Sequence, residues 1–294
     1  MTERLRTTWR SGKRQMCLGE QTRVMAVLNL TPDSFYAASR LSGTAAVLAA
    51  AGTALAEGAD ILDLGAESTR PGAAPLDSRE EQRRLLPAIA AVRRQWPDCW
   101  ISADTRHAAV AGAALAAGAD IINDVTGLGG GADDDAQAEG QAMAALMAAS
   151  GCGVVLMHRR GEFAHMHQLP PLTDPLATVR AGLAAIAARA AAAGIASQQI
   201  VLDPGFGFGK NGAENLPLLA GMGELQTIGY PLLAGVSRKS FLGAVLGGVP
   251  PEQRLFAAVA ATAIAIVHGA SIVRVHDVAA ARDAARLADA VLNA

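Results

Sequence analysis

The segment Gly118-Ala119-Asp120-Ile121-Ile122-Asn123, residues 118–123, decides the fold because it joins the end of a helix to a short buried strand. Gly118 closes an Ala-rich stretch and is suited to the left-handed position that ends a helix. Successive isoleucines are typical of a strand that is buried on both faces, and Asn123 follows them directly. Related segments occur at residues 58–61 and 269–272. The chain therefore predicts a strand–helix unit that is used several times.

Eight short apolar runs extend this pattern over the whole chain. Each run stops at a residue that is able to do chemistry: VMAVLN at Asn29, ILD at Asp63, ISAD at Asp104, IIN at Asn123, VVLM at Met157 and His158, IVLD at Asp203, LLAGVSRK at Arg238 and Lys239, and IVRVH at Arg274 and His276. Stretches with high helix propensity separate the runs, at about 45–57, 80–94, 107–117, 139–150, 174–193, 212–222, 251–268 and 279–292. The repeats predict an α/β fold, a single-domain (β/α)8 TIM barrel with its active site at the C-terminal ends of the strands.

Composition limits the partners that this chain can have. The chain has 294 residues, of which 51% are hydrophobic, so it can bury one large core. A net charge of −2 without a basic stripe argues against a nucleic-acid partner. Residues 255–267 form the longest apolar stretch, shorter than the roughly 20 residues that span a bilayer, so no membrane partner is expected. The first 15 residues lack the apolar core of a secretory signal, which leaves the cytoplasm as the expected location.

The domain organisation follows from where the strand pattern begins. We expect residues 1–22 to be an N-terminal extension, partly disordered or packed on the barrel bottom, and residues 23–294 to form the barrel domain. Cys17, Cys99 and Cys152 are odd in number and widely spaced, which gives neither a disulfide framework nor a metal spacing.

Two loops after strand ends concentrate polar side chains. The loop 29–35 (NLTPDSF) offers hydroxyls and the Asn29 amide, which could hold a phosphate or a magnesium ion, although Pro-Asp is equally typical of an ordinary turn. In the loop 67–72 (ESTRPG), Thr69 and Arg70 precede a Pro-Gly bend, and arginine binds phosphate through two charge-assisted hydrogen bonds. The alternative for this second loop is a helix cap beside a surface arginine.

The remaining strand ends divide into an acceptor set and a basic set. Asp104, Asn123 and Asp203 would point together into the barrel mouth, where buried carboxylates need a ligand rich in N–H donors. The basic set, Arg238, Lys239, Arg274 and His276, suits a polyphosphate. The alternative is a structural ion pair with a strand-end carboxylate, which we expect for Arg238 more than for Arg274.

Three other motifs resemble nucleotide or metal sites, and we do not assign those functions to them. The glycines of DPGFGFGK (203–210) fit neither nucleotide-binding spacing, but they let a flat ligand approach the backbone, with Phe206 as a wall. Asp133, Asp134 and Asp135 are interpreted as a solvated loop rather than a metal site. His158, His165 and His167 are interpreted as loop histidines rather than zinc ligands.

These motifs, taken together and in order, resemble the dihydropteroate synthases over residues 23–285. The resemblance rests on NLTPDSF, GAESTRPGA, the Asp104-Thr105 pair, GADIINDVTG, VVLMH, DPGFGFGK, GVSRKSFLG and IVRVHDV. It implies a transferase of folate biosynthesis and a sulfonamide target. Such an enzyme condenses 6-hydroxymethyl-7,8-dihydropterin pyrophosphate with 4-aminobenzoate, giving 7,8-dihydropteroate and pyrophosphate, with Mg2+ as cofactor. The resemblance also implies a homodimer.

The resemblance assigns roles by position. It implies pterin contacts at Asp104, Asn123, Met157, Asp203 and Lys239; pyrophosphate contacts at Asn29, Thr69, Arg70, Arg274 and His276; 4-aminobenzoate contacts at Pro71, Phe206, Lys239 and Ser240; a magnesium ligand at Asn29; and catalytic roles for Asp104, Lys239 and Arg274.

The chain departs from the family pattern after Ser34-Phe35. Tyr36, Ala37 and Ala38 stand where the family usually has a small residue, Asp and Gly, so this loop lacks the carboxylate and the flexible glycine of the family pattern. Two alternatives follow. A pterin-binding methyltransferase of the methyltetrahydrofolate type would share the acceptor set but has no pyrophosphate to hold, and the Thr69-Arg70 and Arg274-His276 pairs argue against it. A non-catalytic pterin-binding paralogue is supported by the altered loop alone.

Overall fold

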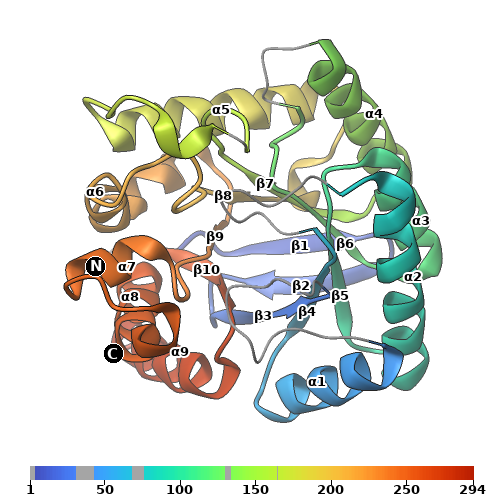
Figure 1. Ribbon diagram of the computed structural model, residues 1–294, viewed down its shortest axis with the longest axis horizontal. Helices are drawn as coiled ribbons and strands as arrows, with labels where there is room; N and C mark the ends of the chain where they lie inside the picture. Colours follow the sequence, from blue (N-terminus) through green and yellow to red (C-terminus); the bar gives the residue numbers. More distant parts are fainter. Residues whose placement is uncertain (1–3, 31–42, 68–75, 130–133, 164) are drawn as a thin grey trace.

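The computed structural model describes residues 4–30, 43–67, 76–129, 134–163 and 165–294. Eight parallel strands close a barrel in the order β10-β3-β4-β5-β6-β7-β8-β9, with helices around it (Figure 1). This confirms the predicted TIM barrel. The strands are β3 (Arg23–Asn29), β4 (Ile61–Gly65), β5 (Trp100–Asp104), β6 (Ile121–Asp124), β7 (Gly153–Met157), β8 (Ile200–Asp203), β9 (Leu232–Ala234) and β10 (Ala270–Val275).

Some strand ends differ from the expected ones. β4 continues beyond Asp63 to Gly65, so Asp63 lies in the middle of a strand. β9 stops at Ala234, and Arg238 and Lys239 lie in the connection that follows. Gly235 interrupts the apolar run there, and glycine weakens a strand interior. Asp63 therefore lies deeper in the barrel than a strand-end residue, and Arg238 and Lys239 lie beyond the strand end.

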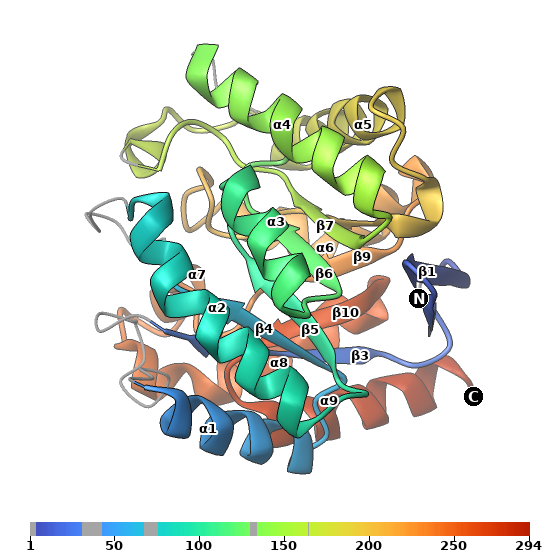
Figure 2. The same cartoon turned by 90° about the vertical axis from the view of Figure 1, so that its right-hand side faces the viewer.

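The helices lie outside the strands, as Figure 2 shows for α1 to α4. They are α1 (Thr44–Ala56), α2 (Ser78–Gln95), α3 (Ala108–Ala117), α4 (Asp134–Ser150), α5 (Pro175–Ala192), α6 (Asn215–Ala220), α7 (Ser240–Val245), α8 (Leu255–Val267) and α9 (Val278–Leu292), with short 3-10 segments at Met166–Gln168, Ser197–Gln199, Met222–Ile228 and Pro251–Arg254. Asp134 and Asp135 were expected in a loop, but they form the first turn of α4, where carboxylates favour the positive end of the helix. Asp133 lies outside the described residues.

Apolar side chains fill the barrel in two layers. One cluster lies between strands and helices, and a second, with Met25, Ile121 and Val201, fills the barrel interior near the N-terminal ends of the strands. Within the described residues, no helix combines the length and apolar character needed to cross a membrane.

A hairpin of β1 (Thr7–Ser11) and β2 (Arg14–Leu18) precedes the barrel. Trp9 is 1% exposed, belongs to the interior cluster, and donates from Nε1 to the carbonyl of Gln199 at 2.6 Å. Gly12 donates its backbone N–H to the carbonyl of Gly151 at 2.8 Å, directly before β7. The hairpin therefore packs across the N-terminal ends of the strands, and Figure 2 shows it beyond one end of the barrel.

The repeated Gly-Ala-Asp segments brace this same end. Gly118 ends α3 in the left-handed conformation, with φ of 113°. Asp120 then accepts from the backbone N–H of Ile101 at 2.9 Å and from Arg93 at 2.6 Å. Asp60 repeats the arrangement, accepting from the backbone N–H of Val24 at 2.8 Å and from Arg282. The carboxylates of Asp60 and Asp120 are thereby hydrogen-bonded and paired with arginines at the N-terminal end of the barrel.

Candidate functional site

Four polar side chains from four strands meet inside the C-terminal half of the barrel. Arg274 of β10 donates from Nε to Asp63 Oδ2 at 2.6 Å and from Nη2 to Asp104 Oδ2 at 2.6 Å. Asn123 of β6 donates from Nδ2 to the same Asp63 oxygen at 3.3 Å. These four residues, Asp63, Asp104, Asn123 and Arg274, are called the arginine cluster below. The sequence favoured a ligand role for Arg274, and the structure adds two carboxylate partners.

Burial sets the protonation behaviour of the arginine cluster. It raises the pKa of Asp104 to about 7, with Arg274 opposing and the carboxylates of Asp63 and Glu67 reinforcing the rise. Burial alone would lower the pKa of Arg274, but Asp63 and Asp104 raise it above its usual range. The guanidinium therefore stays charged, and Asp104 titrates near neutral pH.

Asp203 ends β8 and lies beside Met157, its register partner at the end of β7. The Asp203 side chain is buried, and its Oδ1 accepts the backbone N–H of Gly205 at 2.7 Å. Burial raises the pKa of this carboxyl, while the Gly205 hydrogen bond and Lys239 act in the opposite direction. Within the described residues Oδ2 accepts no hydrogen bond, so it is available to a ligand donor.

Lys239 approaches the loop that follows β8. Its Nζ donates to the carbonyl of Phe206 at 2.8 Å and lies 4.1 Å from the centroid of the Phe208 ring. Burial lowers the pKa of this lysine to about 8, with Asp203 opposing. Gly207 has φ of 80°, and a Cβ there would lie 3.4 Å from Lys239 Cδ, so glycine permits this close approach.

The two phenylalanines of this loop point in different directions, and Phe206 does not lie where the sequence predicted. Phe206 was expected in the wall of the 4-aminobenzoate pocket, but its ring is fully buried and stacks on Phe241 with centroids 6.2 Å apart. Phe208 instead faces Lys239 and meets Phe163 edge-on, with centroids 6.5 Å apart. The alternating positive-φ glycines turn successive rings to opposite sides. The sequence analysis assigned no role to Phe208.

Lys210 supports this loop from within. Its buried Nζ donates to the carbonyls of Gly205 at 2.8 Å, Phe208 at 3.0 Å and His158 at 3.2 Å. Burial lowers its pKa to about 7. A lysine enclosed by carbonyls cannot reach a phosphate, so the loop is structural around Lys210 and open only at its ligand-facing edge.

The two arginines of the expected basic set are both paired with carboxylates, and its histidine is neutral. Arg238 pairs with Asp277 through two hydrogen bonds of 2.8 and 2.6 Å, which confirms the structural ion pair expected for it. His276 Nδ1 lies 3.1 Å from Ser237 Oγ. Burial and the positive charge of Arg274 lower the His276 pKa to about 4. His276 is therefore neutral at physiological pH and can only donate or accept a hydrogen bond.

The remaining predicted residues surround this centre. Asn29 ends β3 and is half-buried, and Ser240 begins α7 and is exposed. Thr69, Arg70 and Pro71, like Tyr36, Ala37 and Ala38, lie outside the described residues.

An ion pair stands at the base of the second loop. Glu67 accepts from Arg106 at 2.7 and 2.9 Å, and its Oε1 also accepts the backbone N–H of Leu76 at 3.0 Å. The carboxylate therefore joins the residue before segment 68–75 to the residue after it.

His158 follows β7 outside any helix or strand, as expected for a loop histidine. It is only 7% exposed, and a Cβ on Gly182 of α5 would lie 2.3 Å from its Cδ2, so glycine leaves the room that the buried ring needs. Burial lowers its pKa to about 3. Within the described residues, no group of three or more His, Cys, Asp or Glu side chains could hold a metal ion.

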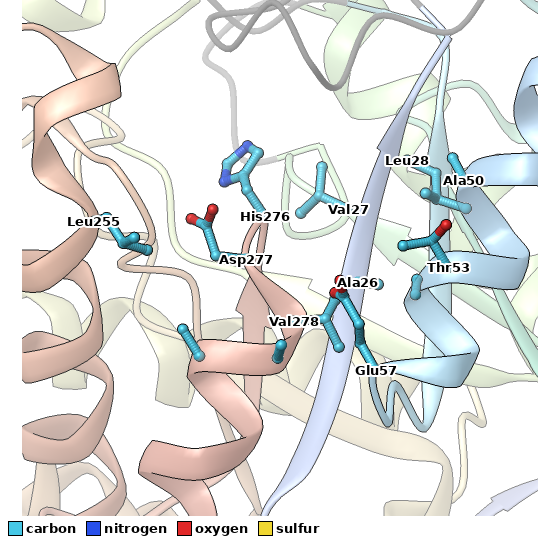
Figure 3. A pocket seen from close by; sticks show the side chains of 13 residues that line it. Ala26, Val27, Leu28, Ala50, Thr53, Glu57, Leu255, His276, Asp277 and Val278 are labelled. Carbon is cyan, nitrogen blue, oxygen red and sulfur yellow. The ribbon is translucent and has the colours of Figure 1, made fainter.

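A pocket of about 490 Å³ lies on the His276 side of this centre. Figure 3 shows His276 and Asp277, which follow β10, on one side of it, and on the other Thr53 of α1 and Glu57, the residue after that helix. Its walls include no member of the arginine cluster, so we place the chemistry at the strand ends and not in this pocket.

Comparison with known proteins agrees with this geometry. The chain matches the family model of the pterin binding enzymes over residues 25–276. It is 40% identical to the dihydropteroate synthase of Synechocystis over 273 residues, covering 93% of this chain and 91% of that one. It is 39% identical to the Escherichia coli dihydropteroate synthase, covering 92% of each chain.

Solved structures agree as well. The dihydropteroate synthase of Yersinia pestis, in complex with a sulfonamide drug, superimposes with a TM-score of 0.89 at 38% identity, over 98% of this chain and all of the other. That of Xanthomonas albilineans with 4-aminobenzoic acid gives 0.85 at 39% identity, over 99% of this chain and all of the other. The barrel, the strand-end polar residues and these comparisons together show that the chain belongs to the pterin-binding enzyme family, among the dihydropteroate synthases.

Proposed function

We propose that this chain condenses 6-hydroxymethyl-7,8-dihydropterin pyrophosphate with 4-aminobenzoate, giving 7,8-dihydropteroate and pyrophosphate. The observation that carries the proposal is the convergence of buried acceptors, Asp203 and Asn123, with the charged Arg274 at one end of the barrel. A pterin presents N–H donors on one edge, and a pyrophosphate presents negative charge at the other end of the substrate. The site offers partners for both.

Pterin binding uses the acceptors in the barrel. Asp203 Oδ2 accepts ligand N–H donors, and Met157 packs beside it at the neighbouring strand end. Asn123 adds an amide group, and the Lys239 ammonium meets the pterin carbonyl. A ligand that donates to Asp203 favours its ionised form, because hydrogen bonds to a carboxylate stabilise the charge.

Departure of the pyrophosphate is assisted by Arg274 and by neutral His276, with Asn29, Thr69 and Arg70 as further contacts. Breaking the bond between the pterin methylene carbon and the leaving oxygen places positive charge on the pterin. Ionised Asp104 stabilises that charge electrostatically. The amine of 4-aminobenzoate then forms the new C–N bond and loses a proton, so no covalent enzyme intermediate is needed.

Mg2+ is the proposed cofactor. The Asn29 side chain at the end of β3 provides an oxygen of the kind that Mg2+ binds, while the carboxylates of Asp63 and Asp104 are engaged by Arg274. The site thus fits an ion held mainly by pyrophosphate oxygens and water. When bound, the ion neutralises charge on the leaving group.

The 4-aminobenzoate pocket is assigned to the connections after β8 and β9. Ser240 supplies a polar contact to the carboxylate, and Lys239 and Pro71 of the second loop line the pocket. Phe208 provides the aromatic wall in place of Phe206, because its ring lies 4.1 Å from Lys239 Nζ.

Pyrophosphate release tests the reaction. Purified protein with Mg2+ receives the pterin pyrophosphate, 4-aminobenzoate, or both. Release that requires both substrates supports the synthase. Pterin binding without release would support a non-catalytic paralogue, and methyl transfer from methyltetrahydrofolate would support the methyltransferase alternative.

We also propose a cytoplasmic homodimer, with residues 23–294 as one folding domain and residues 1–22 as its extension.

Exposed apolar side chains gather at α7 and α8, including Val245 at 63% and Phe256 at 86% exposed, and a second copy would cover them. Sedimentation of wild type against Phe256→Ser tests this face. A monomeric wild type would contradict the dimer.

A further inference from the structure

Asp63 connects the two halves of the proposed site. It lies in the middle of β4 and is fully buried. Its Oδ2 accepts from Arg274 Nε at 2.6 Å and from Asn123 Nδ2 at 3.3 Å. One carboxylate oxygen therefore touches the arginine proposed for the pyrophosphate and the amide proposed for the pterin, from strands on either side of the barrel.

The hydrogen bonding of Asp63 differs from that of the structural aspartates. Asp60 and Asp120, at the opposite end of the barrel, accept hydrogen bonds with both carboxylate oxygens. Asp63 Oδ1 is buried and has no partner among the described residues. An unpaired buried oxygen costs about 1–3 kcal/mol, so a carboxylate kept for stability alone is expected to use both oxygens. Both hydrogen bonds of Asp63 are instead accepted by Oδ2, and both come from residues of the proposed site.

The contacts of Asp63 fix which atoms reach the ligand. Because Asn123 donates its Nδ2 to Asp63, its Oδ1 is the atom left to meet the ligand, and it accepts an N–H. Arg274 donates Nε to Asp63 and Nη2 to Asp104, so the two carboxylates fix its guanidinium plane and leave its remaining N–H groups for the pyrophosphate. Without Asp63, the amide could rotate and present donors to the donors of the pterin.

We infer that Asp63 is a positioning residue that orients Asn123 for the pterin and Arg274 for the pyrophosphate at the same time. The inference rests on the proposed roles of those two residues. Asp63 itself touches neither substrate half, and its effect on binding passes entirely through its two partners.

Double-mutant cycles test whether the effect of Asp63 on binding passes through Asn123 and Arg274. Binding of the pterin pyrophosphate and of free hydroxymethyl pterin is measured by calorimetry for Asp63→Ala, Arg274→Ala, Asn123→Ala, and the two doubles that contain Asp63→Ala. Asp63→Ala should weaken binding of the pterin pyrophosphate about tenfold or more. In the Asn123→Ala background its effect on free hydroxymethyl pterin should shrink to less than about twofold. In the Arg274→Ala background, Asp63→Ala should weaken binding of the pterin pyrophosphate no more than it weakens binding of free hydroxymethyl pterin. Effects of Asp63→Ala that are equal in every background, or absent, would overturn the inference.

Matched variants separate positioning from folding. Asp120→Ala removes a buried aspartate–arginine pair at the other end of the barrel, so it should lower Tm and leave both affinities within about twofold. Where Asp63→Ala does not fold, Asp63→Asn replaces it in the same cycles, because it keeps the shape and one acceptor but loses the charge. Single Arg274 and Asn123 variants that bind normally would refute the proposed site and this inference together. Single variants that bind weakly, with additive Asp63 effects, would refute the inference alone.

Discussion

Replacing Glu81 with glutamine should stabilise the protein at pH 8. Glu81 lies in the first turn of α2 and is fully buried, and the Thr105 hydroxyl only partly offsets the effect of burial on its carboxylate. Burial, with the negative charges of Glu67 and Asp104, raises its pKa from 4.5 to about 7. At 1.36 kcal/mol per pH unit, this rise corresponds to about 3 kcal/mol of stability lost when the folded protein must ionise Glu81.

The sign of the pH dependence follows from the proton count. Between pH 4.5 and about 7 the folded state keeps the Glu81 proton and the unfolded state releases it, so stability falls as pH rises through this window. Glutamine never ionises. The advantage of Glu81→Gln over wild type should therefore be small near pH 4.5 and should grow to about 3 kcal/mol by pH 8.

Urea unfolding followed by circular dichroism, at several pH values across this window, gives the difference directly. Glu80→Gln is the matched control, because Arg83 and Arg84 lower the pKa of neighbouring Glu80 to about 2 and its charge does not change in this range. A Glu81→Gln advantage that stays constant from pH 4.5 to 8 would refute the reasoning, and would indicate that the positive N-terminus of α2 keeps Glu81 ionised.

Three further predictions concern the substrates. Asp203→Asn should weaken pterin binding at least tenfold, about 1.4 kcal/mol, because the amide N–H groups of the new side chain would face the N–H groups of the pterin. If a folded variant binds the pterin with unchanged affinity in calorimetry, the pterin contact lies elsewhere. The profile of kcat/KM against pH should be bell-shaped, with an acid limb near 7 from Asp104, which must be ionised, and an alkaline limb near 8 from Lys239, which must be protonated. A flat profile from about pH 6 to 9 would exclude both assignments. Phe208→Ala should raise the KM for 4-aminobenzoate and spare pterin affinity, whereas Phe206→Ala should cost about 3–5 kcal/mol of stability through its buried ring. The reverse pattern would return Phe206 to the ligand pocket.

Local sequence predicted the barrel because its units are local. A strand buried on both faces needs only a short apolar run, and a glycine after an Ala-rich stretch marks the end of the preceding helix. Segments 58–61 and 118–121 behave as the repeat suggested, since each aspartate bonds the backbone of the preceding barrel strand. The ends of β3, β5, β7 and β8 fall at the expected residues.

The places where prediction from sequence was wrong are those that depend on backbone direction. Loop 203–210 contains three positive-φ glycines, Gly205, Gly207 and Gly209, and the resulting turns decide which aromatic ring enters the core. Composition gives no preference between Phe206 and Phe208, since both are equally apolar. The burial of His158 was not predicted for a related reason, because the room left by Gly182 on α5 becomes visible only when that helix is packed against β7.

The sequence by itself determined the fold, the family, and the types of side chain that end each strand, since these follow from short motifs. Tertiary structure alone decided which of those side chains act together. Arg274 meets Asp104 across 170 residues and Asp63 across 211, and these pairs exist because barrel closure brings β10 beside β3 and aims both carboxylates inward. The partner of a buried charged side chain depends on which strands face each other in the barrel. It also depends on burial, because an unpaired buried charge is unfavourable. A short segment of sequence contains neither the strand arrangement nor the degree of burial.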